Sequence, residues 1–579
     1  MAANKVFKSD NRGDKWEVIS DDITAQVDRN TWPVMDRYWG VDAVQKDVST
    51  SLFGMAVSLA ESQVKEDLLY VGTDDGVISV TEDAGGDWYQ VKTFPGVPEY
   101  TYVSDILPDK YDENVVYASF DNHKRDDFKP YILKSSDKGR TWTCISSNLP
   151  KNGTVHTIEQ DNVVPELLFV GTEFGAFFSI DGGKIWTQLK SGLPSVAVKD
   201  MVIQERETDL VLATFGRGFY ILDDYSPLRV LNKELYDSSA YIFPINDALM
   251  YTMTRGRYGQ GSTPYYGKNP DFGAVFTYYV KESPKTLKQM RKEEEGKLVK
   301  DKKPIPIPGM EELRAEENEV KPYLIFTITD QEGNIVRKIN KSISKGLKRM
   351  AWNMTYPSMG NVRLKDDKYS PTNNDRDGMA IMPGTYYVSL AQWVRGEITE
   401  LVEPVEFSTV VLDNVTLPAP DRAELVAFLQ KTTKLVRAIQ ASQQLMGHLK
   451  ERVQYLKQAI NNTPDATPEL LAKATEMEQQ LDDIRWAFSG QSPKASREEN
   501  WPAPPSINER VGALVWSHWG STSRVSETQM QMYDILAEDF PPLLEQLKNL
   551  AEVKIPALEA ELNALGAPWT PGRIPTWNE

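Results

Sequence analysis

The chain has 579 residues, too many for a single hydrophobic core, so its length predicts several domains. Its 65 basic and 83 acidic side chains give a net charge of −18, which argues against nucleic acid and anionic membranes as principal partners. A single cysteine excludes an intrachain disulfide, only 4 histidines make a zinc site improbable, so that we expect no metal or cofactor, and the absence of a run of about 18 apolar residues predicts no membrane span.

An eight-residue motif occurs four times in the N-terminal part of the chain. It reads Ser/Thr-x-Asp/Asn-x-Gly-x-x-Trp and begins at residues 9, 81, 135 and 179, at spacings of 72, 54 and 44 residues. Repeats of about 40 to 50 residues that contain several strands indicate propeller blades. The carboxylate accepts backbone N–H groups in a tight turn, the glycine permits the turn conformation, and the tryptophan packs as an apolar wedge. We therefore predict structural roles for Ser9, Asn11, Gly13, Trp16, Thr81, Asp83, Gly85, Trp88, Ser135, Asp137, Gly139, Trp142, Ser179, Asp181, Gly183 and Trp186.

The segments that flank the motifs repeat as well. Residues 68–80, 168–180 and 210–222 each read as an apolar strand, a glycine-containing turn and a second apolar strand, which indicates hairpins. This pattern predicts blades over residues 52–92, 101–146, 154–189 and 197–246. Residues 5–20 supply only the last hairpin of a further blade, so residues 1–247 are predicted to form part of a β-propeller.

A blade without its inner strands exposes unpaired strand edges, which is unfavourable. We therefore expect either that the chain is the C-terminal part of a longer protein, with an N-terminal segment that completes the propeller, or that a second chain completes it. A ring closed by these blades alone is the alternative, because small propellers have four to eight blades.

One face of such a propeller gathers polar and aromatic side chains. The turns after the second strand of each blade, the loops between blades and the long connection 28–47 lie on the same face. Mixed charges and aromatic rings suit a glycan or a polypeptide ligand. The binding candidates are Trp32, Arg37, Tyr38, Trp39, Asp74, Asp75, His123, Arg125, His156 and Arg217.

Glycoside hydrolysis requires two carboxylates at a defined separation. Asp36, Asp105, Glu173 and Asp200 are the catalytic candidates on this face. The sequence contains no phosphate loop, nucleophile elbow or zinc-protease helix. We therefore favour a non-catalytic binding protein and keep a glycoside hydrolase as the alternative.

The pattern changes after the propeller. Segments such as 322–330 and 384–393 predict strands of an immunoglobulin-like β-sandwich over residues 248–417, with a charged, proline-containing insertion at 283–320. From residue 418 onward apolar residues recur at three- and four-residue steps, which predicts an α-helical hairpin or bundle over 418–579.

Start and stop signals locate three of these helices. Asp421 and Glu424 form a capping-box pattern, and Thr467 followed by a proline begins the second helix. A third segment begins near Ser526 and ends near Gly566. The link at 490–525 contains Trp501, Trp516 and Trp519, which we expect to dock on neighbouring domains.

The string VGTEFG…SIDGGKIW…LATFGRGFYILDDYSPLR resembles the bacterial sortilin-type or BNR (Asp-box) repeat "glycosyl hydrolase" family over roughly residues 1–415. The resemblance implies an exported protein, in the periplasm, on the outer surface or secreted, with a further propeller segment ahead of this region. The first residues, MAANKVFKSDNRGDKW, lack the apolar segment of a signal peptide. A third possible function is that of a subunit of a cell-envelope complex whose propeller is completed by another chain.

Overall fold

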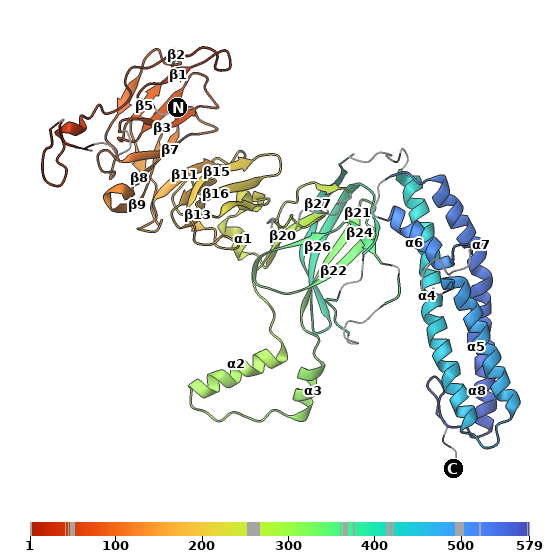
Figure 1. Cartoon of the computed structure of the whole chain (residues 1–579). Helices are drawn as coiled ribbons and strands as arrows, with labels where there is room; N and C mark the ends of the chain where they lie inside the picture. Colours follow the sequence, from red (N-terminus) through yellow and green to blue (C-terminus); the bar gives the residue numbers. More distant parts are fainter. Residues whose placement is uncertain are drawn as a thin grey trace. The chain divides into compact units, whose positions relative to one another are not determined.

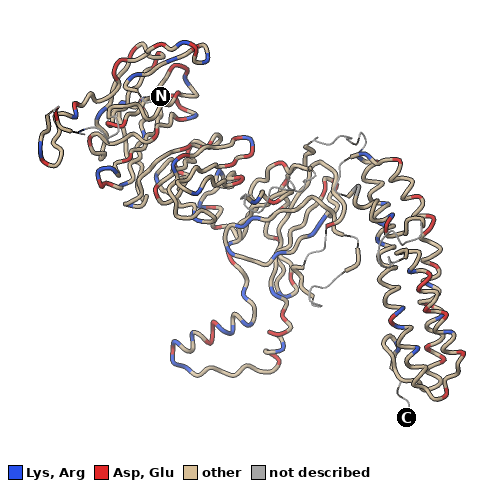
Figure 2. The backbone as a smooth tube through the Cα atoms, viewed as in Figure 1, with Lys and Arg blue, Asp and Glu red and all other residues tan. Residues whose placement is uncertain are grey.

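The protein is mainly β, with several helices toward its C-terminus (Figure 1). The computed structural model describes residues 3–40, 42–44, 46, 53–251, 267–358, 360–362, 369–373, 377–412, 419, 422–491, 503–519, 523–575 and 577. The chain divides into two compact units, Met1–Leu235 and Tyr236–Glu579. Acidic and basic residues are interspersed along both units rather than gathered in one stripe (Figure 2).

The first unit consists of antiparallel sheets in which strands adjacent in sequence are adjacent in space, the arrangement of a propeller blade. A hairpin of β1 (Phe7–Lys8) and β2 (Glu17–Val18) comes first. Blade 1 contains β3 (Ala56–Glu61), β4 (Leu69–Thr73), β5 (Ile78–Thr81) and β6 (Tyr89–Val91). Blade 2 contains β7 (Tyr102–Pro108), β8 (Val116–Asn122), β9 (Asp127–Ser135) and β10 (Thr143–Cys144). Blade 3 contains β11 (Val155–Gln160), β12 (Leu168–Thr172), β13 (Gly175–Ser179) and β14 (Thr187–Gln188). Blade 4 contains β15 (Val198–Gln204), β16 (Asp209–Thr214) and β17 (Gly218–Leu222).

Successive blades bury apolar faces against one another. Tyr70 and Val80 of blade 1 share a core with Phe120 of blade 2, and Phe169 of blade 3 shares one with Leu212 of blade 4. A glycine in the second strand allows this close approach. A Cβ on Gly72 would lie 2.5 Å from Val103 Cγ1, and one on Gly171 would lie 2.9 Å from Val198 Cγ1.

The innermost strand of every blade carries a β-bulge at the same place. The register shifts between Ala56 and Ser58, between Val103 and Asp105, between Val155 and Thr157, and between Val198 and Asp200. A bulge leaves one residue unpaired and redirects its side chain. The bulged residues are Val57, Ser104, His156 and Lys199.

The repeated motifs close the turns between the third and fourth strands. In blade 2, Ser135 Oγ donates to Asp137 Oδ1 at 2.8 Å, and the Gly139 N–H donates to Ser135 Oγ at 2.8 Å. Equivalent bonds occur in the motifs that begin at Ser9, Thr81 and Ser179. The carboxylates of these motifs are therefore engaged within their own turns.

The motif tryptophans differ in burial. Trp142 and Trp186 are buried between blades, whereas Trp16 is 56% exposed. Trp16 lies at a cavity of about 700 Å³ that Phe7 and Leu59 also line. Two inner strands that would complete a blade with β1 and β2 are lacking among the described residues of this chain.

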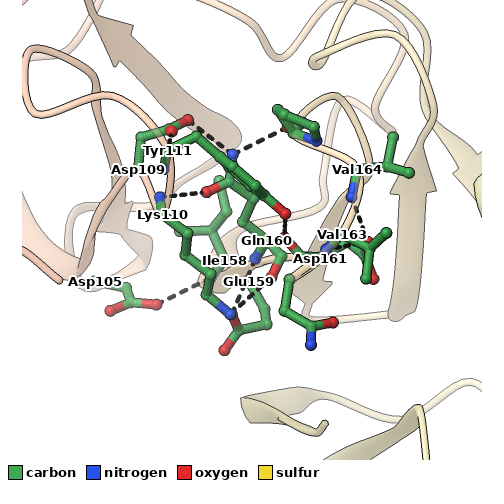
Figure 3. A network of polar contacts seen from close by, with 12 residues as sticks. Asp105, Asp109, Lys110, Tyr111, Ile158, Glu159, Gln160, Asp161, Val163 and Val164 are labelled. Atoms are coloured by element: carbon green, nitrogen blue, oxygen red, sulfur yellow. Dashed lines mark hydrogen bonds and ion pairs between the residues drawn. The ribbon is translucent and has the colours of Figure 1, made fainter. Parts of the chain in front are cut away.

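A polar network joins blades 2 and 3 at the edge opposite the bulges (Figure 3). The Gln160 side chain donates to Asp109 Oδ2 at 2.7 Å, and the Lys110 N–H donates to Gln160 Oε1 at 2.8 Å. Lys110 Nζ also lies 2.8 Å from Glu159 Oε1. This network aligns the first turn of one blade with that of the next.

Asp161, also drawn in Figure 3, holds the segment after β17. This carboxylate is fully buried and accepts from the backbone N–H groups of Val163 and Val164 at 2.8 and 2.7 Å. Its Oδ1 also accepts from Tyr225 Oη at 2.6 Å and from Arg229 Nη2 at 2.8 Å. Arg229 lies in a short 3₁₀ helix, Ser226–Val230. The chain that leaves blade 4 is therefore fastened to blade 3.

The second unit begins with two sheets that face each other across a common core. One sheet has the order β18 (Ala240–Ile242), β20 (Ala274–Val280), β23 (Gly346–Trp352). The other has the order β19 (Ala248–Met250), β27 (Glu397–Val411), β26 (Gly384–Val394), β21 (Tyr323–Asp330), β22 (Ile335–Ser342). A short pair, β24 (Thr355–Pro357) and β25 (Asp377–Ala380), and two helices, α2 (Leu287–Lys300) and α3 (Met310–Asn318), complete this part.

The first predicted domain boundary, after residue 247, differs from the division in the structure. Residues 240–242 are apolar and were expected at the end of the fourth blade, but as β18 they pair with β20 of the second unit. The contacts divide the chain after Leu235, within the short helix α1 (Lys233–Asp237). Pairing, which the local sequence does not reveal, decides where this strand belongs.

The remaining helices share one apolar core. They are α4 (Arg422–Asn461), α5 (Pro468–Ser489), α6 (Ile507–His518), α7 (Glu527–Asn549) and α8 (Ile555–Ala564). Helix α6, which Ser506 and Glu509 cap reciprocally, falls in a segment expected to be a link. Trp519 follows α6 and packs on the core, while Trp501 and Asp421 lie outside the described residues. No helix in the described part of the chain is long and apolar enough to cross a membrane.

Candidate binding site

The bulges of β11 and β15 place a histidine and a lysine beside each other. His156 Nε2 lies 2.9 Å from Lys199 Nζ and 2.9 Å from Glu173 Oε2. Lys199 Nζ is also 3.4 Å from Glu173 Oε2. The imidazole is buried, whereas the Glu173 and Lys199 side chains are 43% and 42% exposed. A buried ring thus supports an acidic and a basic group that both reach solvent.

The same chain of contacts continues into blade 2. His156 Nδ1 lies 3.7 Å from Asp121 Oδ2, and Asp121 Oδ1 lies 2.6 Å from His123 Nδ1. Asp121 ends β8, and His123 begins the 3₁₀ helix His123–Arg125. Residues from blades 2, 3 and 4 therefore form one polar line.

Burial sets the protonation of this line. Burial lowers the pKa of His156, and the carboxylate of Glu173 only partly opposes that effect. Burial alone would raise the pKa of Glu173, but its hydrogen bond to His156 and the charge of Lys199 outweigh burial and lower it. Near neutral pH the site therefore holds a neutral imidazole and an ionised carboxylate. A neutral Nε2 either accepts from Lys199 or donates to Glu173, so that one of these groups is available to a ligand.

Asp105 lies on the same inner ring of strands but is committed to the protein. Its Oδ1 accepts from the Ile106 N–H, and its Oδ2 accepts from Thr157 Oγ1 and the Ile158 N–H, each at 2.9 Å. These bonds tie β7 of blade 2 to β11 of blade 3. Burial raises the pKa of Asp105 to about 6, and the charge of Asp200 adds to the rise.

Asp74 and Asp75 hold the long first connection on blade 1. Asp74 Oδ1 accepts from the N–H groups of Gly54 and Met55 at 2.9 and 2.7 Å. Asp75 is buried, accepts from the Ala25 N–H at 2.8 Å, and has a pKa that burial raises. Both carboxylates act within the fold rather than toward solvent.

An aromatic arm, residues 28–40, projects from this connection. Val34 and Arg37 bridge across a tight turn, with Met35 and Asp36 at φ of 54° and 58°. The Arg37 guanidinium lies 4.5 Å from the centre of the Trp39 ring. Tyr38 is 69% exposed. The tip of the arm therefore presents a rigid turn with a cation and aromatic surfaces.

A second aromatic group sits at the base of the arm. The Trp32 ring lies 5.5 Å from that of Phe53 and 5.7 Å from that of Tyr100. The Arg125 guanidinium lies 5.8 Å from the Tyr100 ring and donates to the Glu99 carbonyl at 2.6 Å. This group connects the arm to the turn that carries His123.

The structure thus assembles some of the predicted residues and separates others. His156 and Glu173 meet directly, and His123 joins them through Asp121. Arg217 and Asp200 are exposed on blade 4, and Asp36 lies in the turn of the arm. Among the described residues, no group of three His, Cys, Asp or Glu side chains is arranged to hold a metal ion.

Sequence reasoning missed Asp121 and Lys199. Lys199 has a recognisable signal, because VHTIE of blade 3 aligns with VKDMV of blade 4 and puts it at the position of His156. Asp121 has a weaker one, since it lies among several charged residues of the same turn.

No protein-family model matches the chain, and no curated protein matches it. Among solved structures the chain is similar to YCF48 bound to D1 peptide, with 13% identity and a TM-score of 0.24, over 29% of this chain and 51% of that one. It is similar to an ancestral GH74 enzyme with 11% identity and a TM-score of 0.28, over 68% and 41%. It is similar to the GH74 xyloglucanase from Xanthomonas campestris with 13% identity and a TM-score of 0.25, over 39% and 36%. The chain spans about half or less of each of these proteins, and likenesses this low assign no function or substrate.

Proposed function

We propose that the chain is an exported scaffold of the bacterial sortilin-type, Asp-box family that binds a glycan or a polypeptide without converting it. The ligand would lie on the edge of the blades that carries His156, Glu173 and Lys199 and would contact the aromatic arm, residues 28–40. The exported location follows from the family resemblance and belongs to the proposal.

One observation carries this proposal: most carboxylates of the edge are already held by donors of the protein. Asp105 accepts three hydrogen bonds, and Asp74 accepts two from the backbone. Glu173 is paired with His156 and Lys199. A glycoside hydrolase needs a pair of carboxylates free to act as acid and as base or nucleophile. Groups that are fixed by their own protein suit recognition better than proton transfer.

The arm supplies apolar contact to the same edge. Tyr38 and Trp39 are 69% and 38% exposed, and Arg37 stacks on Trp39. Exposed aromatic faces bind the apolar face of a sugar ring or a peptide side chain, and neighbouring charges select polar groups.

The test is a glycan microarray and a peptide library screened with the full chain, followed by titration of the best ligand. We expect Trp39→Ala and Lys199→Ala each to weaken binding about tenfold, as for a residue central to a contact surface. Trp486→Ala, at a 60% exposed site of α5, and Lys184→Ala, in the motif turn of blade 3, are the matched controls. Equal losses in the controls, or no loss in Trp39→Ala and Lys199→Ala, would contradict a ligand site on this edge.

A glycoside hydrolase is the second candidate, and one observation favours it. Asp105 has a pKa raised to about 6, as a proton donor requires, and the charge of Asp200 influences it. In this mechanism Asp105 would protonate the leaving group and Asp200 would act as the second carboxylate. Turnover of chromogenic glycosides, reduced about a hundredfold or more in Asp105→Asn and Asp200→Asn, would establish it and would overturn the binding proposal.

A further inference from the structure

The open face of blade 4 carries exposed apolar side chains. Val202, Phe219 and Ile221, from β15 and β17, are 57%, 75% and 57% exposed. Phe215, in the turn between β16 and β17, is 75% exposed. We call these four residues the terminal face. Contiguous apolar side chains of this kind usually mark an interaction surface.

The corresponding face of blade 3 shows what such a surface does in this fold. The strand pairs Thr172–Gly175 and Thr214–Gly218 put blades 3 and 4 in register, so that Phe219 occupies the position of Ala176. Ala176 is fully buried because blade 4 packs against it. Within this chain the equivalent surface is therefore an interface between blades.

A polar contact repeats the same relationship. Asp105 Oδ1 accepts from the following N–H of its own strand, and Asp105 Oδ2 accepts from Thr157 and Ile158 of the next blade. Asp200 stands at the position of Asp105, immediately after the bulge, and its Oδ1 accepts from the Met201 N–H at 2.9 Å. Its second oxygen has no donor among the described residues. Asp200 thus makes the contact within its own blade and lacks the contact to a following one.

The chain that follows β17 in the first unit does not cover the terminal face. Tyr225 packs on Phe169 of blade 3, with ring centres 5.1 Å apart, and Arg229 binds Asp161 of blade 3. This segment therefore leaves blade 4 toward the side that is already occupied.

We propose that the terminal face docks a further propeller blade supplied by a polypeptide outside residues 1–579. The apolar side of that blade covers Val202, Phe215, Phe219 and Ile221. Its innermost strand donates a backbone N–H and a hydroxyl to the free oxygen of Asp200, as Ile158 and Thr157 do for Asp105. This inference is independent of any ligand on the edge of the blades.

The experiment is site-specific photo-cross-linking with the full chain in the cells that produce it. Phe219→p-benzoylphenylalanine is the probe, and Ile185→p-benzoylphenylalanine, at a 62% exposed position of blade 3 away from this face, is the control. After illumination the linked peptides are sequenced by mass spectrometry. The proposal expects a peptide outside residues 1–579 whose sequence has paired apolar strands and the Ser/Thr-x-Asp-x-Gly-x-x-Trp motif.

Three results would overturn the proposal. They are a link to residues of this chain, whether in the same molecule or in a second copy; a link to a peptide without the blade pattern; and a yield no higher than that of the Ile185 control. Asp200→Ala in the probe-carrying chain tests the polar contact and should lower the yield severalfold without changing the thermal unfolding of the purified chain, because Asp200 is exposed. An unchanged yield would remove Asp200 from the docking contact.

Discussion

His156 and Lys199 are the bulged residues of neighbouring inner strands, and their Nε2 and Nζ atoms lie 2.9 Å apart. Each bulge turns a side chain that would otherwise continue the strand pattern toward the edge of its blade. The repeated backbone geometry therefore puts two chemically different side chains in contact, with Glu173 completing the group.

Acidification should weaken the fold through His156. Its pKa is lowered in the folded protein, so the unfolded chain binds the proton more tightly, and the stabilising effect present above about pH 6.5 is lost as the pH falls. His156→Gln should reduce the difference in melting temperature between pH 7.5 and pH 5.5. Thermal unfolding of both proteins at the two pH values measures this. An identical pH dependence in the variant would show that His156 does not titrate as described.

Asp105 should have the opposite dependence. Its pKa is raised to about 6, so its effect on stability is most favourable at low pH and is lost as the pH rises through about 6. Asp105→Asn loses hydrogen bonds at every pH but avoids the buried charge. Its stability relative to wild type should therefore improve between pH 4.5 and pH 7.5, as measured by denaturant unfolding. A gap that widens over this range would contradict the prediction.

Arg229→Ala should destabilise the first unit strongly. It leaves the fully buried Asp161 without its cationic partner, and such losses cost about 3 to 5 kcal/mol. Tyr225→Phe removes one hydrogen bond to the same carboxylate and should cost about 1 to 3 kcal/mol. Arg206→Ala breaks an exposed pair with Glu207 and serves as the control. Hydrogen exchange of peptides from blades 3 and 4 locates the effect, and equal effects of Arg229→Ala and Arg206→Ala would refute it.

Gly171→Ala should separate blades 3 and 4. The added Cβ would lie 2.8 Å from the Val198 carbonyl oxygen and 2.9 Å from Val198 Cγ1, and overpacking of this kind costs about 1 to 3 kcal/mol. Gly296→Ala, in α2 with no atom within 4 Å of the new Cβ, should be neutral or slightly stabilising. Denaturant unfolding of the two variants compares them directly. A tolerated Gly171→Ala would mean that the blades have room to move apart.

The local signals of this chain are strong where one segment satisfies its own chemistry. The motif at 135–142 contains the hydroxyl, carboxylate and glycine that close its turn, so the turn can be read from the residues alone. The helix at 468–489 likewise announces its start with Thr467 and Pro468. The insertion helix α2 was less clear, because its cap at Thr286 precedes a largely charged segment.

The sequence by itself determined the repeated strands, the motif turns, the apolar stripe of the helices and the general location of polar residues on one edge, because each depends on neighbours within a few positions. The tertiary structure decided that His156 contacts Lys199, that Asp105 is held by Thr157 of the next blade, and that Ala240–Ile242 pairs outside the propeller. These relationships join residues from different strands and blades. They depend on strand pairing and on the packing of one sheet against the next, which no short segment of the chain specifies.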